Sequence, residues 1–101
     1  MDIKRIATEA IRTKQILYAK YKTDLSERIL YPYAIFESTT SNIDLFCIQH
    51  RNPAKPLDND QPRYFTLKDF SSARLGQTVF NVDARFSPGH IKNCRRVIVS
   101  I

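Results

Sequence analysis

The chain has 101 residues, with 16 Lys plus Arg against 10 Asp plus Glu, so its formal net charge is +6. This length suits one domain. Apolar residues make up 43% of the chain and only 2 residues are Gly, which excludes disordered and collagen-like classes. No apolar run approaches the roughly 18 residues of a membrane span, and the charged N-terminus lacks the apolar centre of a signal peptide. We therefore expect a basic, cytoplasmic protein with no membrane partner.

The positive charge is concentrated in the second half of the chain. Residues 1–50 hold 7 basic and 6 acidic side chains, whereas residues 51–101 hold 9 basic and 4 acidic ones. A one-sided positive field attracts phosphates, so nucleic acid or a nucleotide is a reasonable partner. A modest positive charge that serves only solubility is the alternative.

Residues 2–12 have the spacing of an amphipathic helix. Apolar residues recur at i, i+3, i+4 and i+7, and Asp2 stands where a helix N-cap is expected. The sequence therefore predicts one N-terminal helix.

The rest of the chain has the composition of short strands. β-branched and aromatic residues dominate six segments: 16–21, 28–37, 43–49, 63–67, 73–80 and 95–101. Pro32 predicts a bulge or an edge position in the second of these. Residues 50–62 contain three prolines and no periodicity, so they predict a long loop, which in a small domain is often functional.

One helix followed by short strands and tight turns is typical of a mainly β fold: a small, strongly bent antiparallel sheet or barrel of the Sm-like or SH3-like kind. We expect a single domain over residues 1–101, with the helix at about 2–12, the barrel at about 15–80 and a C-terminal extension whose strand lies at about 95–101. An unpaired apolar strand at the C-terminus would leave an exposed edge. We expect it to pair within the chain, with pairing to a second chain as the alternative.

The cysteines and histidines do not form a convincing metal site. Cys47 and His50 are three residues apart on a predicted strand, so their side chains should lie on opposite faces. His90 and Cys94 resemble half of a zinc site, but a cysteine that packs as a small hydrophobe is commoner. We expect no metal and no cofactor, and the sequence leaves a disulfide between Cys47 and Cys94 open without supporting it.

The sequence contains no recognisable catalytic set. Its acids are dispersed, with Asp58 and Asp60 the closest pair, and Ser71 and Ser72 lack the context of a nucleophile. The two glycines cannot form a phosphate-binding loop. We therefore expect a non-enzymatic protein.

Aromatic and basic residues alternate on two predicted strands, 16–21 and 63–67. Small barrels bind single-stranded nucleic acid by stacking bases on exposed aromatic rings while Lys and Arg follow the backbone. Alternation places Phe65 and Leu67 in the core and leaves Tyr64 as the stacking candidate. The alternative for any of these rings is that it fills a small core.

The order of several short blocks resembles the WYL domain, a small Sm-like barrel found mainly in bacterial transcriptional regulators. The blocks lie within residues 9–80 and are Glu9–Arg12, Leu17–Tyr21, Arg28–Ile35, Asp44–Gln49 and Arg63–Leu67, with Phe70 and Phe80 at the positions of later apolar anchors. The Trp-Tyr-Leu signature is replaced by Asp44, Leu45 and Phe46, and Asp69 stands where the family often has a second Arg. We expect no helix-turn-helix before the barrel. The resemblance implies a regulatory, ligand-sensing module of the kind associated with transcription control and with bacterial or phage defence.

The resemblance also implies where an anionic ligand would bind. Arg63 would make bidentate phosphate contacts, with Arg28 and Lys68 adding positive charge and Tyr64 stacking. His50 and Arg51, at the mouth of the long loop, would close over the ligand. The alternative is an interaction module that has lost ligand binding and that docks or forms a homodimer through its C-terminal strand. Salt separates these functions, because phosphate contacts weaken steeply with salt and apolar strand pairing does not.

Overall fold

One helix and six strands make up the regular structure of residues 2–101, which are the residues that the structure, a computed structural model, describes. The elements in chain order are α1 (Ile3–Thr13), β1 (Gln15–Tyr21), β2 (Arg28–Ser38), β3 (Ile43–Arg51), β4 (Gln61–Thr66), the short 3-10 helix η1 (Leu67–Asp69), β5 (Phe70–Val79), the 3-10 helix η2 (Pro88–His90) and β6 (Cys94–Ser100). None of the helices in the described part of the chain is long and apolar enough to cross a membrane.

The predicted N-terminal helix is present, and its capping is as expected. The Asp2 carboxylate accepts a hydrogen bond from the backbone N–H of Arg5 at 3.0 Å, which satisfies one of the free donors of the first turn. At the other end Lys14 adopts the left-handed conformation, with φ of 56°, and ends the helix. The buried face is formed by Ala7, Ala10 and Ile11.

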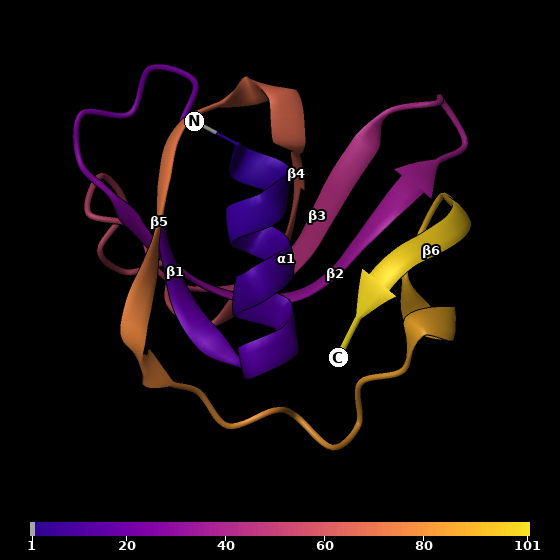
Figure 1. Ribbon diagram of the computed structural model, residues 1–101. Helices are drawn as coiled ribbons and strands as arrows, with labels where there is room; N and C mark the ends of the chain where they lie inside the picture. Colours follow the sequence, from indigo (N-terminus) through magenta and orange to yellow (C-terminus); the bar gives the residue numbers. More distant parts are fainter. Residues whose placement is uncertain (1) are drawn as a thin grey trace.

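All strand pairs in the sheet are antiparallel, in the order β4-β3-β2-β1-β5, and β6 is added to β2. The first part of β2 pairs with β1 at residues 28–30, and its second part pairs with β6 at residues 34–38. In Figure 1 the sheet curls around α1, with β1 and β5 on one side of the helix and β2 and β6 on the other. The predicted class is thus confirmed: a mainly β fold with one N-terminal helix and a bent antiparallel sheet, which stays open because β4 and β5 end it on either side.

Two features of β2 and β6 confirm predictions from the sequence. The pairing of β2 with β3 shifts between Pro32 and Ala34, so the proline stands at an irregularity, as its missing N–H requires. The C-terminal strand pairs inside the chain, with Val99 opposite Ile35 and Val97 opposite Phe36.

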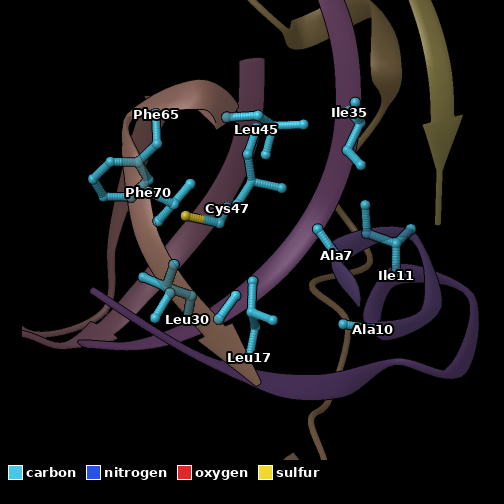
Figure 2. Close-up of a cluster of buried hydrophobic side chains, with 13 residues drawn as sticks. Ala7, Ala10, Ile11, Leu17, Leu30, Ile35, Leu45, Cys47, Phe65 and Phe70 are labelled. Carbon is cyan, nitrogen blue, oxygen red and sulfur yellow. The ribbon is translucent and has the colours of Figure 1, made fainter. Parts of the chain in front are cut away.

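The main core lies between α1 and the concave face of the sheet (Figure 2). Cys47 and Leu45 of β3 point into it together with Leu30 of β2, and Ala7 and Ile11 of α1 approach Ile35 from the other side. Its buried members are Ala7, Ala10, Ile11, Leu17, Ala19, Leu30, Ile35, Leu45, Cys47, Phe65, Leu67, Phe70 and Ala73. The expectation that Phe65 and Leu67 are core residues is therefore confirmed, since each is 6% exposed.

A second apolar layer covers the opposite, convex face. The connection between β5 and β6, here called the outer segment (residues 80–93), crosses this face and packs Ile91 against Phe36 and Ala34. Two tyrosine hydroxyls anchor it: Tyr33 Oη accepts from the backbone N–H of Asp83 at 2.8 Å, and Tyr64 Oη accepts from that of Lys92 at 3.1 Å. The convex face, here called the outer face, is therefore partly covered by the outer segment, and the concave face is called the inner face.

Candidate functional site

Aromatic side chains form a continuous row across the outer face. Alternation places residues 44, 46, 48 and 50 of β3 on the face opposite the buried Leu45, Cys47 and Gln49. Successive ring centroids in the row lie 4.9–6.0 Å apart, within the range of favourable aromatic contacts. This outer aromatic row contains, in spatial order, His50, Tyr31, Phe80, Tyr33, Phe86, Phe46, Tyr64 and Phe36.

Tyr64, next to Phe36 at one end of this row, is its most exposed tyrosine, with 41% of its surface accessible. Its ring is tilted on Phe46 at 5.1 Å between centroids and meets the edge of Phe36 at 6.0 Å. Its hydroxyl is held by the backbone N–H of Lys92. The ring is thus fixed on one side and open to solvent on the other.

A pocket of about 250 Å³ opens beside Tyr64, lined by Phe36, Asp44, Tyr64, Lys92 and Asn93. One oxygen of the Asp44 carboxylate, Oδ1, is buried and has no hydrogen-bond partner among residues 2–101. The side chain of Lys92 has no ion-pair partner in the described chain. The pocket is therefore lined by aromatic rings, by Lys92 without an ion-pair partner, and by Asp44, whose Oδ1 lies buried beneath the surface without a hydrogen bond.

A second hollow, of about 360 Å³, lies farther along the row. Its walls are Tyr33, Phe46, Ile48, Asp83, Arg85, Phe86 and His90. Arg85 forms a bidentate pair with Asp83, at 3.1 Å from Nε to Oδ1 and 2.9 Å from Nη2 to Oδ2. The hydrogen bonds from Arg85 lower the pKa of Asp83, so this cation is already matched by an acid.

His50 and Arg51 lie where β3 ends and the long loop begins, as expected. His50 Nδ1 is 2.7 Å from Asp60 Oδ1, and the His50 ring is stacked on Tyr31 at 5.0 Å. These contacts join the two ends of the loop. Arg51 is exposed and has no ion-pair partner within residues 2–101.

Arg28 lies on the inner face at the rim of the core. Its guanidinium donates to both oxygens of Asp24, at 2.6 Å from Nε and 3.0 Å from Nη2, and to the buried Gln49 at 3.0 Å. It also lies over the ring of Phe65, at 5.4 Å from the centroid. The Arg28 hydrogen bonds hold the pKa of Asp24 below its ordinary value, because they stabilise the carboxylate.

Arg63 reaches the same region from β4, where it stands opposite Cys47 of β3. Its guanidinium forms an ion pair with Asp58 of the long loop. Burial raises the pKa of the Cys47 thiol well above its usual range, and the charges of Arg63 and Arg28 act in the opposite direction. Both arginines therefore face the same end of the core.

The six predicted ligand-binding residues do not come together in one place. Arg28 and Arg63 are on the inner face with carboxylate partners, and Tyr64 and His50 are on the outer face. Lys68 is exposed on η1, and Arg51 is exposed at the end of β3. Sequence reasoning did not select Asp44 and Lys92. The alternation of β3 was a usable signal for Asp44, because it places this acid beside Phe46 on the outer face.

Among residues 2–101 there is no group of three or more His, Cys, Asp or Glu side chains that could hold a metal ion. Cys47 and Cys94 are free thiols, and Cys47 is buried while His50 points to the other face of β3, as alternation predicted.

No protein-family model, curated protein or solved structure matches this chain. The resemblance to the WYL family therefore stays a prediction.

Proposed function

We propose that this protein is a non-enzymatic module that binds an anionic ligand, a single strand of nucleic acid or a nucleotide, on its outer face. One base would stack on Tyr64, with a phosphate near Lys92. The observation that supports this most directly is the Tyr64 ring, open on one side and held by Phe46, Phe36 and the Lys92 backbone. With this activity the module would have the regulatory, ligand-sensing role that the WYL resemblance implies.

A pre-positioned ring suits base stacking. Stacking of a base on an aromatic side chain contributes about 1–3 kcal/mol and tolerates any sequence, because every base has a π face. Tyr64 is already ordered by its ring contacts and its hydroxyl hydrogen bond. Little side-chain entropy is therefore lost when a base arrives.

The distribution of unpaired charge supports the same face. In the basic half of the chain, five arginines have acidic partners: Arg63, Arg74, Arg85, Arg95 and Arg96. Lys92 has none within residues 2–101 and lines the pocket beside Tyr64. It is the cation best placed to meet a phosphate of a base stacked there.

Substitution of Tyr64 tests this proposal. Tyr64→Ala removes the ring and should weaken the binding of a fluorescently labelled single-stranded oligonucleotide about tenfold, measured by anisotropy at fixed low salt. Tyr64→Phe keeps the ring, loses only the hydroxyl acceptor, and should bind nearly as well as the wild type. Equal affinity of all three proteins, with folding verified by circular dichroism, would contradict the proposal.

A second function is favoured by a separate observation at β6. This strand pairs with β2 on one side only, and Val97 at its centre is 38% exposed. A strand with a free edge can pair with another chain. The protein would then be a docking or homodimerisation module.

A further inference from the structure

We propose that the pocket beside Tyr64 selects guanine, and that the carboxylate of Asp44 makes the selection. This inference rests on the proposed function, because it requires a base to be stacked on Tyr64. Stacking alone does not distinguish one base from another. The inference adds a preference for one base.

Asp44 has an unusual environment for a carboxylate. It lies on β3, which pairs with β2 on one side and β4 on the other, and its cross-strand neighbours are Phe36 of β2 and Thr66 of β4. Its Oδ1 is buried without a partner in the described chain, although nearly all buried polar atoms have one. An unmade hydrogen bond of this kind is costly. If the carboxylate turns so that Oδ1 reaches the pocket, a donor there supplies the interaction that the protein does not.

The chemistry of a carboxylate restricts which base can supply that donor. An ionised carboxylate accepts hydrogen bonds and donates none. The Watson–Crick edge of guanine presents two adjacent donors, N1–H and the N2 amino group, which match the two oxygens of a carboxylate. Adenine and cytosine present one amino group beside an acceptor nitrogen, and thymine presents one N–H between two carbonyls. The torsion about Cβ–Cγ of Asp is broad, so the carboxylate of Asp44 can turn toward the base.

The other residues of the pocket favour a nucleotide over a cationic protein side chain. An arginine or lysine of a partner could also pair with Asp44 and pack on Tyr64. However, Lys92 is one of the residues that line the same pocket, and the whole chain carries a net charge of +6, so both disfavour a basic partner. A neutral base with an attached phosphate satisfies both Asp44 and Lys92.

The test uses the full chain and four oligothymidine strands that contain one central dG, inosine, dA or dC. Inosine differs from guanosine only by the missing N2 amino group. The wild type should bind the dG strand about tenfold more tightly than the other three. Asp44→Asn should bind all four strands with nearly equal affinity, because an amide cannot accept from two adjacent donors. Asp60→Asn, at the other end of the outer aromatic row, removes the same charge and should keep the preference.

The outcomes separate this inference from the proposed function. If the wild type binds all four strands equally, or if Asp44→Asn keeps the dG preference, guanine selection by Asp44 is wrong while strand binding stands. If the wild type binds none of the strands, both proposals fail. Binding of an arginine-rich peptide in place of the strands, with loss in Asp44→Asn, would also overturn the inference and would indicate a protein partner.

Discussion

Asp24, in the turn between β1 and β2, has donors on both carboxylate oxygens. Arg28 donates to Oδ1 and Oδ2, and the backbone N–H of Tyr21 donates to Oδ2 at 2.8 Å. The two side chains of this ion pair are only 18% and 16% exposed, so solvent screens the pair weakly. This arrangement indicates that Arg28 has a structural role whether or not it also meets a ligand.

The stability of the protein should therefore depend on the ionisation of Asp24. The Arg28 hydrogen bonds lower the pKa of Asp24 from its ordinary value of 3.8, so folding favours the ionised form. This contribution is complete above pH 3.8 and is lost as the pH falls through the lower pKa of the folded state. At pH 7 we expect Asp24→Asn to be less stable than the wild type by about 2 kcal/mol. The difference should shrink as the pH falls below 3.8.

Urea unfolding of both proteins between pH 7 and pH 2.5 measures this difference in the free energy of unfolding. The other carboxylates contribute equally to both proteins, so their contribution cancels. Arg28→Lys keeps the charge but loses the bidentate geometry, so its stability at pH 7 should lie between the two. A difference between wild type and Asp24→Asn that stays constant over the whole range would contradict the assigned role of this pair.

At the scale of the elements, Gly76 sets how β5 packs on β1. The register between these strands shifts between Gln15 and Leu17, and the carbonyl of Gly76 accepts from the side chain of Gln15 at 2.8 Å. A Cβ at position 76 would lie 2.8 Å from Tyr18 Cε2 and 2.9 Å from the carbonyl oxygen of Ile16. The second contact is with backbone, which cannot move aside without disturbing the irregular pairing.

We expect Gly76→Ala to destabilise the fold by about 1–3 kcal/mol, as overpacking does elsewhere. Gly89→Ala is the matched control, because its Cβ would meet only Ser87 Oγ, at 3.8 Å. The control should be neutral or slightly stabilising, since alanine restricts the unfolded chain more than glycine does. The urea concentration at the midpoint of unfolding measures both effects, provided that the dependence of the unfolding free energy on urea concentration is the same in all three proteins. Equal midpoints for the two variants would show that the β1–β5 contact is looser than the structure indicates.

The elements that the sequence predicted well are those with a local signal. The helix spacing, the Asp2 cap and the composition of the strands act within a few residues, and each element lies within about three residues of its predicted bounds. Pro32 also marked its irregularity correctly, because the missing N–H is a local property. The outer segment had no periodic pattern, and it is placed by distant partners, the hydroxyls of Tyr33 and Tyr64.

The same reasoning explains what was predicted of the candidate site. Alternation correctly left Tyr64 exposed and Phe65 buried. It could not show that residues from the outer segment would form a pocket with Tyr64, because this depends on how the whole chain packs. Nor could charge counting show that Arg28 and Arg63 would pair with Asp24 and Asp58, since each pair depends on how a loop folds back onto the strand that follows it. The basic half of the chain is consequently less available to a ligand than its composition suggested.

At the scale of the whole molecule, the open sheet leaves β4, β5 and β6 each with one unpaired edge in the described chain, and this allows a test of self-association. Val97 at the centre of β6 is 38% exposed, and Val79 at the end of β5 is 65% exposed. Arg95 and Arg96 begin the β6 edge with charged side chains, a feature that discourages strand pairing between molecules. We therefore expect the protein to sediment as a monomer over a wide range of concentrations.

Val97→Lys distinguishes this expectation from homodimerisation. In an antiparallel dimer centred on β6, the two introduced lysines would stand opposite each other and repel, while the pairing of β6 with β2 inside each chain would be kept. Val79→Lys places the same charge on β5 as a control. If the wild type is a monomer, both variants should sediment as it does. A wild-type dimer that Val97→Lys dissociates and Val79→Lys leaves intact would instead assign β6 to self-association, and the sheet edge would become the functional surface.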